Sequence, residues 1–278
     1  MSQEQLTPES VPTVNGMPML GLGTWQNTDP GQCAESVRMA LESGYRNIDT
    51  AQVYENEESV GEGIRTASVD REQVFLATKV WYKQLAHDDV IESTHESLNR
   101  LGVDSVDLLY PHWPSGPYDL EETMSAFNEL YDDGLIEHIG VSNFTIDHLE
   151  EAQEASDAPI FALQVECHPL LQQKELREYC DAEDIELVAY SPLARGSVFD
   201  NAELQDIAEK HDASEAQVSL AWLREKGITA IPKATSEEHI RDNWKSLSLA
   251  LDEDDISNID AIDREDRNIN PSFGPDSW

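Results

Sequence analysis

The most constraining feature of this sequence is a short apolar run, typical of a β-strand, that recurs eight times. A polar stretch of helical length follows each run, and apolar residues recur in it at helical spacing, as in Cys33, Val37, Ala40 and Leu41. Strands that alternate with helices in this way are typical of a (β/α)8 TIM barrel, an α/β fold. The predicted strands are Met19–Trp25, Tyr45–Thr50, Val74–Val80, Val106–Trp113, Ile136–Ser142, Ile160–Glu166, Leu187–Ser191 and Ile228–Pro232.

Some segments fall outside this repeat. The pair Asn15-Gly16, between two short extended runs, predicts an N-terminal β-hairpin. Extra helices are predicted before strand eight and at the C-terminus, in Asn201–Lys210, Ser214–Lys226, Glu237–Leu247 and Asp252–Ile262. No linker interrupts the pattern, so we expect residues 1–278 to form one domain. An open doubly wound sheet is the alternative, but no GxGxxG follows the first strand.

The charge is extreme, with 56 acidic and 18 basic residues and a net charge of −38. Nucleic acid and anionic membranes would be repelled by such a chain. The acidic residues are dispersed in short clusters, which predicts a surface adapted to high salt, where counterions screen the repulsion. The alternative is an acidic protein that is merely very soluble.

The three cysteines have no CxxC spacing, so the sequence indicates neither a disulfide framework nor a zinc site. The first ten residues are polar, and no apolar run approaches the length of a membrane span. We therefore expect a soluble cytoplasmic protein without an export signal.

Four residues with useful chemistry fall at or just after the ends of strands two, three and four: Asp49, Tyr54, Lys79 and His112. In a barrel of this kind the carboxyl ends of the strands form the active face. We expect Tyr54 to protonate a carbonyl oxygen, helped by an ammonium at Lys79 that lowers the phenol pKa. Asp49 would orient Lys79, and His112 would hydrogen-bond the substrate. Taken singly, each residue also has an ordinary structural explanation.

Several motifs together resemble the aldo-keto reductase superfamily, in particular the shorter microbial type similar to 2,5-diketo-gluconate reductases. These motifs are GYRNIDTAQVYENE, ATKVW, HWP, IGVSNF, QVECHP, AYSPL and IPKATS. The similarity runs from about Val11 to Ile262. It implies a (β/α)8 barrel whose catalytic tetrad is Asp49, Tyr54, Lys79 and His112, with Tyr54 as the general acid.

The resemblance also implies a nicotinamide cofactor. Ser142, Asn143 and Gln164 match residues that hydrogen-bond the carboxamide. Tyr190 matches the aromatic residue that stacks on the nicotinamide ring. The other cofactor-binding residues implied are Ser191, Leu193, Lys233, Ala234, Thr235, Ser236, His239 and Asn243.

The adenosine end of this implied site departs from the family pattern. Lys233, Ser236 and Asn243 match the contacts to the 2′-phosphate, its neighbour and the adenine. NADPH-dependent members commonly have an arginine where this chain has His239, which lacks a bidentate fork. Arg241 lies about 200° further around a helix and cannot simply replace it. NADPH is favoured as the cofactor, and NADH is plausible.

By the same resemblance, aromatic and catalytic side chains ring the substrate mouth, together with a short loop after strand four and the C-terminal tail. The side chains are Trp25, Tyr54, Trp81, His112 and Trp113. We therefore expect a monomeric NAD(P)H-dependent enzyme that reduces small aldehydes or ketones. A cofactor-binding regulatory or structural protein on the same fold is the alternative. A metal-dependent hydrolase lacks support, since the histidines show no shared ligand spacing.

Overall fold

The computed structural model describes residues 7–8 and 11–275. In this part of the chain eight parallel strands follow one another around a barrel, and the predicted (β/α)8 fold is confirmed. Between the first and last strands, the Gly21 amide donates to the Ala230 carbonyl at 2.8 Å and the Ala230 amide to Met19 at 2.9 Å. The strands are β3 (Leu22–Gly23), β4 (Asn47–Asp49), β5 (Phe75–Val80), β6 (Val106–Pro111), β7 (Ile136–Ser142), β8 (Ile160–Glu166), β9 (Glu186–Tyr190) and β10 (Thr229–Ala230).

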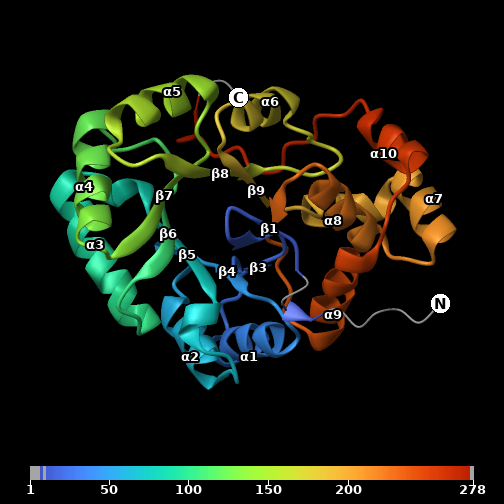
Figure 1. Ribbon diagram of the computed structural model, residues 1–278, viewed down its shortest axis with the longest axis horizontal. Coiled ribbons are helices and arrows are strands. Elements are labelled where there is room, and N and C mark those ends of the chain that lie inside the picture. Colours follow the sequence, from blue (N-terminus) through green and yellow to red (C-terminus); the bar gives the residue numbers. More distant parts are fainter. Residues whose placement is uncertain (1–6, 9–10, 276–278) are drawn as a thin grey trace.

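Helices surround the strands on the outside of the barrel (Figure 1). Among the described residues they are α1 (Pro30–Glu42), α2 (Glu57–Thr66), α3 (His87–Leu101), α4 (Leu120–Asp132), α5 (Ile146–Ala155), α6 (Lys174–Ala182), α7 (Ala202–His211), α8 (Glu215–Glu225), α9 (Glu237–Lys245) and α10 (Glu253–Asp260). The extra helices are those predicted, with α7 before strand eight and α9 and α10 after it. Asp29 caps α1, and Thr145 forms a capping box at α5.

The first and last strands are shorter than predicted, because the barrel closes there through isolated bridges instead of a regular ladder. Leu20 pairs with Ala230 and Gly23 with Lys233. A Cβ atom at Gly23 would lie 2.6 Å from the Ile231 carbonyl oxygen, so this close approach of two backbones requires glycine. The sequence pattern located these strands, but not their irregular ends.

The predicted hairpin is formed by β1 (Thr13–Val14) and β2 (Met17–Pro18), joined by Asn15 and Gly16 with positive φ. Met17 is buried in the apolar cluster that fills the inside of the barrel, together with Leu108, Tyr110 and Ile231. The hairpin is also tied to β9 by a 2.7 Å hydrogen bond from Asn15 to Glu186. It therefore contributes to the barrel interior.

All three cysteines are free and buried, and burial raises the pKa of Cys33 to about 11. No helix in the described part of the chain is long and apolar enough to cross a membrane. Most of the N-terminal segment, on which the expectation of no export signal rests, lies outside the described residues, as do the last three residues of the tail.

Candidate active site

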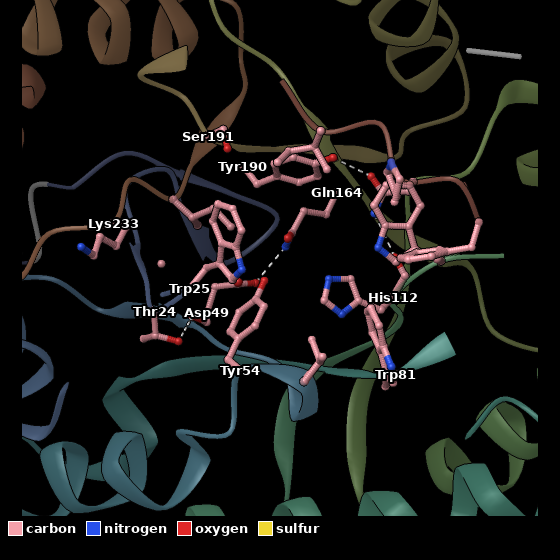
Figure 2. Close-up of a pocket in the computed structure, with 18 residues that line it drawn as sticks. Thr24, Trp25, Asp49, Tyr54, Trp81, His112, Gln164, Tyr190, Ser191 and Lys233 are labelled. Atoms are coloured by element: carbon pink, nitrogen blue, oxygen red, sulfur yellow. Dashed lines mark hydrogen bonds between the residues drawn. The ribbon is translucent and has the colours of Figure 1, made fainter. Parts of the chain in front are cut away.

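The four candidate catalytic residues meet at the carboxyl end of the barrel, where Figure 2 shows Asp49, Tyr54 and His112 and where Lys79 is paired with Asp49. Asp49 ends β4, and Lys79 is the last but one residue of β5. Tyr54 ends the short helical turn Gln52–Tyr54 that follows β4, and His112 comes directly after β6. Neighbouring parallel strands end at the same rim, so this chain order is enough to bring the residues together.

Asp49 and Lys79 form a buried ion pair, with 2.5 Å between Lys79 Nζ and Asp49 Oδ1. The ammonium also donates to the Thr50 carbonyl oxygen at 2.8 Å, and Gln164 Nε2 donates to Asp49 Oδ2 at 2.8 Å. Burial lowers the pKa of Lys79, and the charge of Asp49 opposes that shift. Both carboxylate oxygens are therefore engaged, and the lysine is held in one position.

Tyr54 lies beside this pair, with Lys79 Nζ 5.3 Å from the centre of its ring. Burial raises the pKa of the Tyr54 phenol well above its ordinary value, and the Asp49 carboxylate raises it further. The net shift is therefore upward, opposite to the lowering that an ammonium at Lys79 alone would produce, because loss of solvent is the largest cause. The contribution of Lys79 to this pKa stays a prediction. The phenol is protonated and can act as a donor.

His112 packs edge-on against Tyr54 and Trp81, with ring centroids 5.8 Å and 5.3 Å away. Its Nδ1 is buried and has no hydrogen-bond partner in the described part of the chain. Burial and the nearby charge of Lys79 lower the pKa of His112 well below its ordinary value. The imidazole is therefore neutral and offers one donor and one acceptor.

These groups open into a cavity of about 310 Å³. All five predicted substrate residues line it: Trp25, Tyr54, Trp81, His112 and Trp113. Val53 and Ile231, which the sequence reasoning did not name, also line it. The C-terminal tail, which the resemblance implied at the substrate mouth, contributes Ile269, Pro271 and Phe273. The resemblance gave the tail but not these three residues, and Phe273, the large aromatic residue among them, was the signal that could have identified this wall.

One side of the cavity carries the side chains predicted for the nicotinamide end. The Tyr190 hydroxyl donates to Asn143 Oδ1 at 2.8 Å, and Asn143 Nδ2 donates to Ser142 Oγ at 3.1 Å. Asn143, Gln164, Tyr190, Ser191 and Lys233 line the cavity, with Ser142 behind them. Asn143 and Ser191 have left-handed backbones (φ 62° and 47°), which are uncommon outside glycine and cluster at functional sites.

The remaining predicted cofactor residues do not line the cavity: Leu193, Ala234, Thr235, Ser236, His239 and Asn243. Most lie on the segment that leaves β10 and enters α9. Ser236 caps α9 by accepting from the His239 amide at 3.3 Å. Arg241 pairs with Glu237 one turn earlier on the same helix. Arg241 therefore does not take the place of the arginine that His239 replaces.

Arg195, a residue not named from the sequence, stacks on Trp25, with its guanidinium carbon 5.0 Å from the ring centre. It belongs to the turn after β9, where Ala194, Arg195 and Gly196 all have positive φ. Asn143, the ring of Tyr190, Ser191 and Lys233 line the cavity, and Arg195 lies beside it against Trp25. This set fits a flat amide-bearing ring joined to an anionic group.

Comparison with known proteins gives a consistent result. The model of the aldo/keto reductase family matches residues 19–264. The glyoxal reductase of Bacillus subtilis (strain 168) is 42% identical over 90% of this chain and 91% of its own. The methylglyoxal reductase DkgB of Escherichia coli O157:H7 is 40% identical over 94% of this chain and 99% of its own. A solved protein provisionally named 2,5-diketo-D-gluconic acid reductase B superposes with a TM-score of 0.90, at 36% identity over 93% of each chain.

Proposed function

Because the chain belongs to the aldo/keto reductase family and is therefore an oxidoreductase, we propose that it reduces small aldehydes and ketones to alcohols, with NADPH as the preferred coenzyme and Tyr54 as the proton donor. The observation that carries the proposal is the buried arrangement of Asp49, Lys79, Tyr54 and His112 at the end of one aromatic-lined cavity. A protein that only binds a cofactor has no need for such a group.

A bound nicotinamide coenzyme would supply the hydride that the carbonyl carbon receives. Tyr54 donates its proton to the carbonyl oxygen as negative charge develops there. The phenol can do so despite its raised pKa, because the oxygen of a forming alkoxide is more basic than a phenolate. Lys79 stabilises the phenolate left behind, and Asp49 keeps the ammonium aimed at the ring.

His112 is proposed to orient the carbonyl. Its neutral ring can donate one hydrogen bond to the substrate oxygen, and the contacts with Tyr54 and Trp81 fix the plane of the imidazole. Asn143 supports the same residue from behind by donating to the His112 carbonyl oxygen at 2.9 Å. The oxygen would therefore receive two donors whose positions are set before the reaction starts.

The coenzyme would be held by Ser142, Asn143 and Gln164 at the carboxamide and by the face of Tyr190. Its adenosine end would reach the segment that carries Lys233, Ser236, His239 and Asn243, with Ser191, Leu193, Ala234 and Thr235 along the way. NADPH is preferred in this proposal because Lys233 is exposed near the cavity, where its ammonium can meet a 2′-phosphate.

We propose uncharged substrates. Among the described residues that line the cavity, Lys233 is the one cation, and the guanidinium of Arg195 lies against Trp25 outside this lining. In Figure 2, Lys233 lies at the left of the cavity, and Trp81 and His112 lie at the right. The substrate end is formed by aromatic and aliphatic side chains, and a net charge of −38 disfavours anions further. Small dicarbonyls, the substrates named for the glyoxal and methylglyoxal reductases, fit this end better than sugar acids.

We further propose that the chain acts as a single-domain monomer in the cytoplasm and that its acidic surface is an adaptation to high salt. The buried, reduced cysteines and the dispersed acidic residues support these statements. Light scattering on the eluting protein and circular dichroism in about 10 mM and in multimolar KCl test them. A folded, fully active protein at the lower concentration would contradict the salt adaptation.

The decisive experiment follows NADPH and NADH oxidation at 340 nm with glyoxal and with glyoxylate, which differ in charge but hardly in size. We expect turnover with glyoxal, faster with NADPH, and a kcat/KM for glyoxylate at least tenfold lower. Equal use of glyoxylate would contradict the uncharged substrate. Coenzyme binding without turnover of any carbonyl would favour a regulatory protein instead.

A further inference from the structure

A buried carboxylate that the proposed mechanism does not use lies close to the site. Glu166 is the last residue of β8, two residues after Gln164, and its side chain is fully buried. Its side-chain hydrogen bonds in the described part of the chain go to His168, Asn268 and Ile269 and to no member of the tetrad. Its partners belong to the loop that follows β8 and to the C-terminal tail.

The carboxylate of Glu166 accepts hydrogen bonds from four donors. Three belong to the tail: the Asn268 amide at 2.9 Å, Asn268 Nδ2 at 2.9 Å and the Ile269 amide at 2.8 Å. The fourth is His168 Nε2, 3.1 Å from Oε1. Burial alone would raise the pKa of Glu166, but these hydrogen bonds outweigh burial and lower it. The group is a carboxylate surrounded by donors.

After the residues that donate hydrogen bonds to Glu166, the tail continues along the cavity. We call residues 266–275 the strap. Ile269, Pro271 and Phe273 of the strap line the cavity. The Phe273 ring stacks on Tyr82 with centroids 4.3 Å apart and meets Trp81 edge-on at 5.7 Å. The strap is thus held at one end by its hydrogen bonds to the Glu166 carboxylate and at the other end by contacts among aromatic rings. The residues between these two ends form the apolar wall of the substrate end.

We propose that Glu166 is a positioning residue that fixes the strap and thereby limits the size of the carbonyl compound the site admits. This inference rests on the proposed reductase function. The carboxylate suits the role because it can accept from all four donors at once. An amide of the same shape would turn its NH2 group toward at least one N–H of the strap, and an apolar side chain would leave the donors unpaired.

The test uses the full-length protein with Glu166→Gln, which keeps the shape of the side chain and removes its charge. A second variant, Asn268→Asp, leaves β8 untouched and places a second carboxylate against Glu166. Glu186→Gln is the matched control, because Glu186 is also a buried glutamate but holds the hairpin through Asn15. Thermal melts show that each variant is folded.

The first readout is hydrogen exchange of peptides that cover residues 266–273. We expect exchange at Asn268 and Ile269 to be at least tenfold faster in Glu166→Gln and in Asn268→Asp, and unchanged in Glu186→Gln. This readout needs no activity. Unchanged exchange in both Glu166→Gln and Asn268→Asp would overturn the proposal that Glu166 holds the strap in place.

The second readout compares methylglyoxal with phenylglyoxal, two 2-oxoaldehydes that differ in size. Both strap variants should raise the phenylglyoxal to methylglyoxal ratio of kcat/KM at least fivefold, mainly through KM. An equal loss of kcat/KM with both substrates, or a constant phenylglyoxal to methylglyoxal ratio despite faster exchange, would mean that Glu166 supports the fold and does not limit substrate size. If the unaltered protein reduces neither compound, the proposed function fails, and exchange alone decides whether Glu166 holds the strap.

Discussion

The two ends of the proposed site are built differently. At the catalytic end, Asp49 and Lys79 are buried, and each charge is held by a partner within 2.8 Å. At the phosphate end, Lys233 and His239 are exposed, and neither forms an ion pair with a described residue. In the proposed site, the chemistry would therefore depend on groups that fix one another, whereas coenzyme choice would depend on exposed side chains that can change independently.

The same difference decides how each end responds to its surroundings. A buried charge pair is screened little by salt, while an exposed lysine facing a phosphate is screened within about 10 Å at 0.1 M. A substitution at the catalytic end leaves a buried partner without its hydrogen bond. A substitution at the phosphate end removes a side chain whose place water can take. The experiments below use this contrast, beginning with the largest effect.

Replacing Tyr54 with phenylalanine removes the proton donor and keeps the ring that packs on His112. We expect kcat to fall by about 10²–10⁴, the usual contribution of a general acid, with the Kd for NADPH unchanged within about twofold. Steady-state rates at 340 nm and fluorescence titration of the coenzyme measure the two quantities. Tyr131→Phe, at an exposed position, is the control. A Tyr54→Phe variant with more than half of the normal turnover would remove the catalytic assignment.

Replacing Lys79 with methionine leaves the Asp49 carboxylate buried with Gln164 as its remaining side-chain partner. Breaking a buried pair in this way should lower the free energy of unfolding by about 3–5 kcal/mol, in addition to a large loss of turnover. Urea denaturation measures the first effect. Arg65→Met breaks an exposed pair with Glu62 and should cost less than about 1 kcal/mol. Similar losses in the two variants would mean that the buried Asp49–Lys79 pair contributes no more to stability than an exposed pair.

Replacing His239 with arginine should add a bidentate phosphate contact at the other end of the site. We expect the affinity for NADPH relative to NADH to rise about tenfold, and Lys233→Ala to lower it by a similar factor. Titrations in low and high KCl should show that salt weakens the gain, because the new contact is exposed. No change in the ratio for either variant would contradict the proposed position of the 2′-phosphate.

The sequence predicted the catalytic end better than the phosphate end, for a physical reason. Strand order alone brings Asp49, Lys79 and His112 to one rim, so identifying the strands was enough to place them. The raised pKa of Tyr54 was not predictable, since it depends on how completely the fold buries the ring and on the nearby charge of Asp49.

The residues of the substrate wall, in contrast, could not be located from strand order. Ile269, Pro271 and Phe273 come from a tail without regular secondary structure. Their position depends on Glu166, about a hundred residues earlier in the chain. Periodicity carries no information on such a long-range contact, because a buried glutamate at the end of a strand looks the same whether it binds a tail, a metal or water. The motif QVECHP marked the strand and its glutamine, but not this partner.

The smallest predicted effect is the response of the catalytic end to pH near neutrality. The pKa of His112 lies well below its ordinary value and that of Tyr54 well above, so neither group changes charge in the neutral range. His112 has already lost its proton in this range, and burial lowers the pKa of Lys79, so the ammonium loses its proton before Tyr54 as the pH rises. The kcat for reduction should therefore change less than about twofold from pH 6 to 8 and fall only on the alkaline side.

Lys79→Arg sharpens this prediction, because a guanidinium keeps its proton throughout. Whatever activity the variant retains should show no alkaline fall if Lys79 is the group that titrates. Alcohol oxidation has the opposite requirement, since Tyr54 must then accept a proton, so its rate should rise with pH in the unaltered protein. Single-turnover rates at saturating substrate isolate these groups from those that affect binding. An alkaline fall that persists in Lys79→Arg would assign it to Tyr54, and the catalytic end would then respond to pH through its phenol.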